Sequence, residues 1–341
     1  MDRRSRSFLM ACAVCMSLLA AACSQASPEN PAALATPKAP GAPTAAPSAV
    51  SSRPTDPRTP SPYVLDDTEV RTLHADGTDR DYQVLVSLPP SYRKDPNRRY
   101  PVIFVTDANY AFPLIRSIGR RVGDHGDGTE DFILVGLAYA VGETPEYSRR
   151  RDYTPTPHGS ADAVSDMPGR PVVYGESDLY RRFIKEQVFP LIAENYRADM
   201  SRKIYTGHSY GGLLGLDMLI ADPGMFQYYI LGSPSLQFDR QVEFTRMHKA
   251  TSTLKDMPAN VLMVLGAYET LEPSSHDPRY NRSVDMVRNA RRFMDQLKAK
   301  RYPGLHIQMT TIPDEDHLTV FPSVITRGLL WALPGKQRPQ G

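Results

Sequence analysis

The segment from Arg202 to Gly212 constrains the fold more than any other part of this chain. It reads Arg-Lys-Ile-Tyr-Thr-Gly-His-Ser-Tyr-Gly-Gly, with Ser209 at the centre of a Gly-x-Ser-x-Gly motif between an apolar run at 204–206 and a helix-like run at 213–220. Strand, tight turn and helix in this order are the context of a nucleophile elbow. The glycines at 207 and 211 lack Cβ atoms and allow the reversal. We predict a nucleophilic Ser209 at a helix N-terminus that favours developing negative charge; an ordinary glycine-rich turn is the alternative.

The first 23 residues have the features of an export signal. Three arginines at positions 3, 4 and 6 precede an apolar stretch at 8–22, which is short for a membrane span. The stretch ends in Leu-Leu-Ala-Ala-Ala-Cys, and small residues directly before a cysteine resemble a bacterial lipobox. We predict a lipid on Cys23 and an exported protein on the periplasmic face of a bacterial membrane. Simple signal cleavage, which would give a soluble periplasmic protein, is the alternative.

The remaining composition divides the chain into a tether and one domain. Residues 24–62 are rich in Pro, Ala, Ser and Thr, which predicts a disordered, extended tether. Cys12, Cys15 and Cys23 all lie at or before the proposed cleavage point, so the domain at 63–341 has no disulfide, thiol nucleophile or Cys-ligated zinc. With 40 basic and 38 acidic residues, the chain is not typical of proteins whose main partner is nucleic acid. The lipid anchor is the only membrane contact we expect.

Strand-like and helix-like segments alternate from residue 63 onward. We predict strands at 68–73, 82–88, 102–106, 132–138, 204–206, 226–231, 261–265 and 305–312, and helices at 112–122, 178–196, 213–220, 281–300 and 319–333. The first two strands form an antiparallel pair, and the others predict a mostly parallel sheet covered by helices on both faces. A nucleophile after about the fifth strand fits an α/β-hydrolase fold. The long irregular stretch at 141–177 should lie over the carboxyl edge of the sheet, where active sites of such sheets lie.

A serine nucleophile needs a neighbouring base, and in hydrolases of this fold the chain order is Ser, acid, His. Downstream of Ser209 the histidines are His248, His276, His306 and His317. His317 stands in a polar loop directly after the last predicted strand, where the fold places its base. We therefore predict that His317 is the base, with a solvated loop histidine as the alternative.

The acid should follow the strand at 261–265. The chain there offers Glu269 and Glu272, and Asp314 and Asp316 near the base are alternatives. Glu269 is nearer the end of the strand and is our choice; for each of these residues the alternative is a surface carboxylate.

The oxyanion hole of such an enzyme consists of two backbone N–H groups. One is that of Tyr210, which directly follows the nucleophile. The other should come from the turn after the strand at 102–106, and we favour the N–H of Asn109 over that of Ala108.

These motifs together resemble the bacterial putative-esterase branch of the α/β-hydrolases, which includes periplasmic esterases that open the trilactone of catecholate siderophores. The resemblance covers about Val70 to Trp331. It rests on Tyr-Pro-Val-Ile-Phe-Val-Thr-Asp-Ala-Asn at 100–109, Arg-Arg-Asp-Tyr-Thr-Pro-Thr at 150–156, Gly-His-Ser-Tyr-Gly-Gly at 207–212, Ser-Pro-Ser at 233–235, Gly-Ala-Tyr-Glu at 266–269 and Asp-His at 316–317. It implies that Ser209, Glu269 and His317 form a triad, although some siderophore esterases of this type work with a Ser–His dyad.

The chain departs from the family pattern at two positions. Leu236 is followed by Gln237 where the family commonly has a Leu-Trp pair, so a pocket wall differs. Ala108 replaces the usual glycine after Asp107, which affects the geometry of that turn.

Several arginines and tyrosines at the start of the long stretch are candidates for substrate binding. Arginine pairs with oxygens in a forked geometry and stacks on aromatic rings. Arg150 and Arg151, beside Arg149, are therefore candidates for an anionic or catechol-bearing substrate, with ion pairs to Glu146 or Asp152 as the alternative. Aromatic candidates for the pocket, which ordinary packing explains equally well, are Tyr139, Tyr147, Tyr153 and Tyr174.

Three functions agree with these residues. The first is a carboxylic-ester hydrolase, with a ferric catecholate siderophore lactone as one candidate substrate. The second is an acyltransferase that uses the same residues with a sugar or lipid hydroxyl as acceptor. The third is a binding lipoprotein that kept the fold but lost the chemistry. No His-x-x-x-His pattern or acidic ligand cluster appears, so we expect no metal and no other cofactor.

Overall fold

The computed structural model describes residue 60, residues 62–123 and residues 127–336 of the chain. The compact unit begins at Tyr63. The predicted export signal, the lipid on Cys23 and almost all of the predicted tether lie outside the described residues.

One eight-stranded sheet forms the centre of the domain, with strand order β1-β2-β4-β3-β5-β6-β7-β8. β1 pairs antiparallel with β2, β2 pairs antiparallel with β4, and all other pairs are parallel. The strands are β1 Thr68–His74, β2 Asp81–Ser87, β3 Tyr100–Val105, β4 Ile133–Ala140, β5 Ala198–His208, β6 Tyr228–Gly232, β7 Ala259–Gly266 and β8 Leu305–Ile312. The predicted mostly parallel α/β-hydrolase sheet is confirmed.

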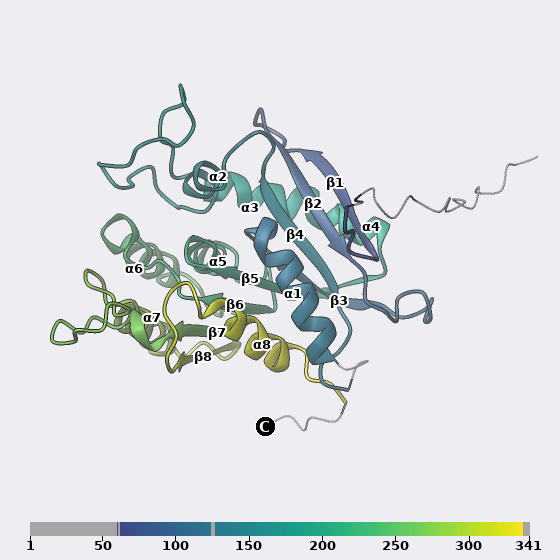
Figure 1. Cartoon of the computed structure of the whole chain (residues 1–341). Helices are drawn as coiled ribbons and strands as arrows, with labels where there is room; N and C mark the ends of the chain where they lie inside the picture. Colours follow the sequence, from purple (N-terminus) through teal and green to yellow (C-terminus); the bar gives the residue numbers. More distant parts are fainter. Residues whose placement is uncertain (1–59, 61, 124–126, 337–341) are drawn as a thin grey trace, which may run out of the picture. The chain divides into compact units, whose positions relative to one another are not determined.

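Helices cover both faces of this sheet (Figure 1). They are α1 Ala108–Gly123, α2 Pro145–Asp152, α3 Ser177–Phe183, α4 Phe189–Asn195, α5 Tyr210–Ala221, α6 Phe238–Thr251, α7 Met286–Lys298 and α8 Phe321–Ala332. The apolar side chains of α1 and α8 belong to the core on one face, and those of α3 to α7 belong to the core on the other. Among the described residues, no helix combines the length and apolarity that crossing a bilayer requires.

The pattern of burial explains why these segments form these elements. β3 and β4 are buried along their whole length, because helices cover both faces of the central strands. α7 buries Ala290, Phe293 and Leu297, which share one face at helical spacing, and exposes its charged residues. α5 is buried nearly all round, since it lies between the sheet and the helices α3 and α6.

The structure differs from the sequence predictions at several places. No helix range was predicted at α6, and the helix predicted at 281–300 begins only at Met286. The single helix expected at 178–196 is α3, a π-helical turn at Ile184–Val188 and α4. Pro190 has no N–H that could bond to the carbonyl four residues earlier. The helical hydrogen bonds next to it therefore span five residues, and the N–H of Phe189 bonds to the carbonyl of Ile184. The stretch at 141–177 was expected to be irregular, but it contains α2. Thr144 is the N-cap of this helix, and Pro145 is its first residue.

The packing of α8 on β6 gives a test of this fold. A Cβ atom at Gly328 would lie 2.4 Å from Cγ2 of Ile230, a fully buried side chain. We expect Gly328→Ala to lower the free energy of unfolding by about 1–3 kcal/mol, because overpacking outweighs the roughly 1 kcal/mol gain in helix propensity. Urea unfolding measures this. Gly224→Ala is the matched control, since open space surrounds that position; equal stability of Gly328→Ala and the parent would contradict the packing.

Candidate active site

Ser209 lies in the turn between β5 and α5 at the carboxyl edge of the sheet. Its φ of 58° is left-handed, a conformation that costs a serine free energy. A Cβ atom on Gly207 would lie 2.5 Å from the carbonyl oxygen of Gly211, and one on Gly211 would lie 2.5 Å from Oγ1 of Thr106. The two glycines are therefore required by close approach, as expected for a nucleophile elbow.

His317 and Glu269 extend a hydrogen-bonded chain from this serine. The Nε2 atom of His317 lies 3.0 Å from Oγ of Ser209, and its Nδ1 atom lies 3.0 Å from Oε2 of Glu269. Glu269 ends a short 3₁₀ turn after β7, and His317 follows β8. The structure thus brings the three predicted catalytic residues together in the order nucleophile, base, acid. This arrangement can transfer a proton from the serine hydroxyl to the imidazole and stabilise the imidazolium that results.

Two further groups hold the carboxylate of Glu269. Its Oε1 atom accepts hydrogen bonds from Oγ of Ser233 at 2.5 Å and from the backbone N–H of Gly266 at 2.8 Å. The residue is only 1% exposed. Hydrogen bonds to a buried carboxylate offset its loss of hydration and fix its orientation, so Oε2 remains directed at His317. No role for Ser233 was predicted from the sequence; its position in the Ser-Pro-Ser segment directly after a strand was the signal that could have indicated one.

The alternative carboxylates have other partners. Asp316 accepts a hydrogen bond from the backbone N–H of Thr319, and such bonds lower the pKa of its carboxyl below the ordinary value. Asp314 accepts a hydrogen bond from the hydroxyl of Tyr268 at 3.1 Å. Glu272 lies in the loop beyond the 3₁₀ turn. Glu269 is thus the carboxylate that reaches the imidazole.

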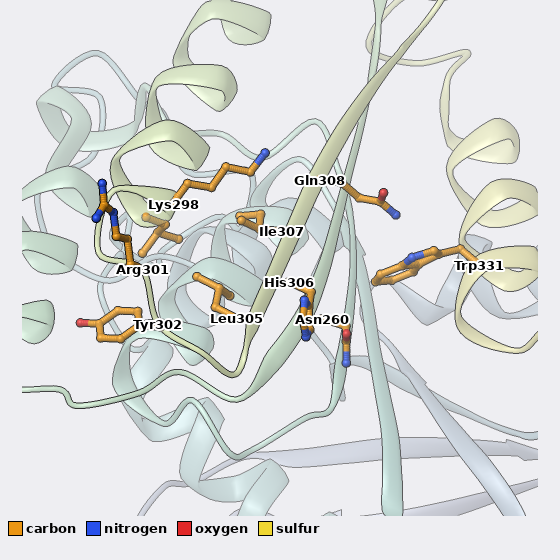
Figure 2. A pocket seen from close by; sticks show the side chains of 10 residues that line it. Asn260, Lys298, Arg301, Tyr302, Leu305, His306, Ile307, Gln308 and Trp331 are labelled. Atoms are coloured by element: carbon orange, nitrogen blue, oxygen red, sulfur yellow. The ribbon is translucent and has the colours of Figure 1, made fainter. Parts of the chain in front are cut away.

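The alternative histidines lie elsewhere. His306 is paired with Asn260 near the amino ends of β8 and β7, which is the opposite edge of the sheet from Ser209. It lines a hollow of about 390 Å³ together with Asn260 and Trp331 (Figure 2). His248 is exposed on α6, and His276 is exposed in the loop before α7.

The predicted oxyanion donors are at the first residues of two helices. Tyr210 begins α5, while Ala108 and Asn109 are the first two residues of α1. Amide N–H groups in a first helical turn have no acceptor within the helix, so they are available to a ligand oxygen. Asp107 precedes α1 with a φ of 56°, which turns the chain sharply at the end of β3.

Asp107 is the centre of a buried polar cluster beneath this turn. Its Oδ1 atom lies 2.8 Å from Nε of Arg149 and accepts a hydrogen bond from the hydroxyl of Tyr139 at 2.8 Å. Its backbone N–H donates to the hydroxyl of Tyr153. Burial raises the pKa of the Asp107 carboxyl, and Arg149 and Tyr139 oppose that shift. The guanidinium of Arg149 also lies 5.6 Å from the ring centre of Tyr210. This arginine therefore contacts one predicted donor residue, Tyr210, and also Asp107, which directly precedes the turn that carries the other candidates.

The two arginines predicted to bind substrate have protein partners. Arg151 is buried, and its guanidinium pairs with Glu143 at 2.6 Å and Asp152 at 2.8 Å. Arg150 pairs with Glu146 at 3.3 Å and donates to a backbone carbonyl at 164. Arg149, which belongs to the same predicted cluster, is the arginine that contacts Asp107 and Tyr210 near Ser209.

His208 is a further buried group of the site. Its ring centre lies 4.6 Å from that of His317 and 5.7 Å from that of Phe321. Burial lowers the pKa of His208 to about 3, and the neighbouring His317 adds to the shift. The ring is therefore neutral at physiological pH and serves as packing behind the imidazole of His317.

The chain matches one protein-family model and is similar to several known esterases. A family model described as Putative esterase matches residues 75–291. The ferri-bacillibactin esterase BesA of Bacillus subtilis is 31% identical over 287 residues, which cover 81% of this chain and 92% of that protein. The siderophore triacetylfusarinine C esterase of Aspergillus fumigatus is 24% identical over 79% of this chain and 94% of its own length. Among solved structures, siderophore hydrolase EstB from Aspergillus nidulans superposes with a TM-score of 0.66 at 24% identity, covering 82% of this chain and 100% of that chain.

The burial of His208 predicts a pH dependence of stability. In the unfolded chain its imidazole titrates near 6.5, whereas the folded pKa is about 3. Below pH 6.5 only the unfolded state binds this proton, so His208 should lower stability by about 1.4 kcal/mol per pH unit as the pH falls towards 4. We expect the free energy of unfolding of His208→Phe, measured with urea at pH 6, 5 and 4, to fall less steeply with pH than that of the parent. The difference between the two slopes should be about 1.4 kcal/mol per pH unit. Parallel curves for the variant and the parent would contradict a buried neutral His208.

Proposed function

We propose that this chain, which belongs to the Putative esterase family, cleaves carboxylic esters through a covalent acyl-enzyme on Ser209. Membership of the family makes the protein a carboxylic-ester hydrolase; the catalytic residues are our assignment. The observation that carries it is the unbroken relay from Oγ of Ser209 through His317 to the buried carboxylate of Glu269, with 3.0 Å at each step.

The geometry supports a two-step reaction. In the first step Oγ of Ser209 forms a bond to the ester carbonyl carbon, while Nε2 of His317 takes the hydroxyl proton and then gives it to the departing alkoxide. In the second step a water molecule attacks the carbonyl carbon of the acyl-enzyme while His317 takes a proton from that water. The imidazolium then gives the proton to Oγ of Ser209, and the acid leaves as the serine hydroxyl re-forms. Glu269 keeps Nδ1 of His317 protonated and stabilises the imidazolium in both steps.

The negative charge on the carbonyl oxygen requires two donors in each step. We assign them to the backbone N–H of Tyr210 and to that of Asn109, with Ala108 as the alternative. Arg149 is a positioning residue in this scheme, because it holds Asp107 at the base of one donor turn and packs over the ring of Tyr210 at the other. Donors that are fixed before the charge develops cost no reorganisation during the reaction.

The ester of a siderophore is the substrate class we propose. Ferri-bacillibactin and triacetylfusarinine C are the compounds named for the two relatives, each matched over nine-tenths of its length. The two alignments cover 81% and 79% of this chain, and this coverage supports a siderophore lactone or ester as the substrate here as well.

Acyl transfer to a hydroxyl acceptor is a second candidate that the same residues allow. A hollow of about 380 Å³ adjoins His317 and is lined by Tyr268, Arg279 and Leu318 among others. Because His317 protonates the departing alcohol, an alcohol must leave and enter beside this imidazole. A sugar or lipid hydroxyl bound there would take the acyl group in place of water and yield a new ester instead of an acid.

We also propose that the enzyme is exported and tethered. The basic residues, the short apolar stretch and the Ala-Ala-Ala-Cys sequence ending at Cys23 support a lipoprotein signal, and the Pro- and Ala-rich residues 24–62 support a spacer between anchor and domain.

Removal of the nucleophile tests the proposed function. We expect Ser209→Ala to reduce hydrolysis of p-nitrophenyl butyrate by about 10⁴-fold or more, because no acyl-enzyme can form. It should also abolish labelling by a fluorophosphonate probe. Ser201→Ala is the matched control, since Ser201 is exposed near the opposite end of the same strand. Undiminished turnover by Ser209→Ala would refute the assignment, and a parent protein that neither labels nor turns over would be a binding lipoprotein.

Loss of Arg149 tests the assignment of the oxyanion donors. We expect Arg149→Met to lower kcat by about 10- to 100-fold, somewhat less than the loss of a whole donor, with KM changed by less than about threefold. The double variant Arg149→Met/Asp107→Asn should have about the same kcat as Arg149→Met alone, because both changes break the same contact at the turn before α1. A raised KM at constant kcat would make Arg149 a substrate contact instead.

A further inference from the structure

The nucleophile has a second hydroxyl neighbour, to which the reaction described above gives no part. Oγ of Ser235 lies 3.2 Å from Oγ of Ser209. The backbone N–H of Ser235 also donates to the carbonyl of Ser209 at 3.2 Å. Ser235 is 3% exposed, so bulk water does not compete for these contacts. One backbone contact and one side-chain contact therefore join this residue to the nucleophile.

The segment that carries Ser235 is fixed on both sides. The backbone N–H of Ser233 donates to the carbonyl of Val264 in β7 at 3.0 Å. A Cβ atom on Gly212 would lie 3.0 Å from Cα of Pro234, so the first turn of α5 packs directly on the segment. The hydroxyl of Ser233 meets the buried carboxylate of the relay. The segment thus contacts both ends of the relay, the acid through Ser233 and the nucleophile through Ser235.

The number of protons decides the direction of the hydrogen bond between the two serines. In the proposed mechanism Nδ1 of His317 carries a proton towards Glu269, so Nε2 carries a lone pair. The hydroxyl proton of Ser209 is donated to that lone pair across 3.0 Å. A serine hydroxyl has one proton, so Oγ of Ser209 can only accept from its other neighbour. The hydroxyl of Ser235 is therefore the donor in the bond between them.

This donor acts on the oxygen whose charge changes during the reaction. As Nε2 of His317 takes the proton, Oγ of Ser209 gains negative charge before its bond to the carbonyl carbon is complete. It gains charge again when that bond breaks in the second step. A hydrogen bond to a charged oxygen is stronger than one to a neutral oxygen, so the hydroxyl of Ser235 stabilises these states more than the resting state. Because the segment is already fixed, the donor needs no rearrangement when the charge develops.

We propose that Ser235 is a further catalytic residue, whose hydroxyl donates to Oγ of Ser209 and stabilises the negative charge on that oxygen in both steps. This inference rests on the proposed function, which supplies the acyl-enzyme chemistry. The proton of Ser235 stays on Ser235 throughout, while the proton of Ser209 moves to His317. The two serines of the segment thus differ in role, since Ser233 acts through Glu269 and the imidazole, whereas Ser235 acts on the nucleophile itself.

Removal of the Ser235 hydroxyl tests this role. We expect Ser235→Ala to lower kcat for p-nitrophenyl butyrate by about 5- to 20-fold, with KM changed by less than about threefold, because the lost bond strengthens only as charge develops. The rate constant for labelling of Ser209 by a fluorophosphonate should fall by a similar factor, since that reaction also begins with attack by Oγ. End-point labelling counts the active molecules, so each rate refers to folded enzyme. Ser87→Ala is the matched control, because it removes a buried hydroxyl at the opposite edge of the sheet.

The pH profile of kcat/KM distinguishes a direct effect on the nucleophile from an effect through the base. In the proposed mechanism the acidic limb of this profile reports the imidazole of His317. Ser235→Ala should lower the whole profile without moving the midpoint of that limb, because the contacts of the imidazole are unchanged. Ser233→Ala should move the midpoint, because it removes a hydrogen bond from the carboxylate that faces the imidazole. A moved midpoint in Ser235→Ala, or a kcat equal to that of the parent, would overturn the inference.

The activity of the parent separates this inference from the proposed function. A parent that cleaves the ester, loses that activity in Ser209→Ala and keeps it in Ser235→Ala would leave the proposed function standing alone. A parent without turnover, or undiminished turnover by Ser209→Ala, would remove both proposals.

Discussion

The tight reversal between β5 and α5 is the constraint on which the rest of the site depends. Ser209 is left-handed, and its backbone N–H bonds to the carbonyl of Gly232 in the adjacent strand, while the hydroxyl of Tyr205 donates to the carbonyl of Gly211. These contacts enforce a conformation that is unfavourable by itself. Because β7 and β8 are parallel to β5, their carboxyl ends deliver Glu269 and His317 to the same edge of the sheet, within reach of the serine hydroxyl.

Two buried carboxylates organise this edge, and each is stabilised differently. Glu269 accepts hydrogen bonds from Ser233 and Gly266, and these leave its second oxygen for the imidazole. Asp107 instead pairs with Arg149 at the turn that precedes α1. A buried carboxylate without such partners would be costly, so removal of one partner should disturb geometry as well as charge. In the proposed mechanism the first carboxylate orients the imidazole of His317, and the second supports the turn to which we assign one oxyanion donor.

Two segments outside the sheet contribute the residues that surround the turn at Ser209. The stretch at 141–177 carries Arg149 and the residues at 158–160, and the start of α6 carries a left-handed turn with Arg240. The sheet provides a rigid frame for the serine and its partners, while these two segments line a hollow of about 540 Å³ beside Tyr210.

The alternation of strands and helices and the sharp turn at Ser209 could be predicted from the sequence alone, because glycine placement and apolar periodicity are local properties. The strand predicted at 305–312 coincides with β8 for the same reason. The proposed order of nucleophile, acid and base followed from the fold class that this alternation indicates. Only the tertiary structure decided that Ser233 holds Glu269, that Asp107 pairs with Arg149, and that the guanidinium of Arg151 turns inward to Glu143 and Asp152. Those partners come from separate elements of the fold, and a hydrogen bond between distant segments depends on how the sheet brings them together, which no local pattern encodes.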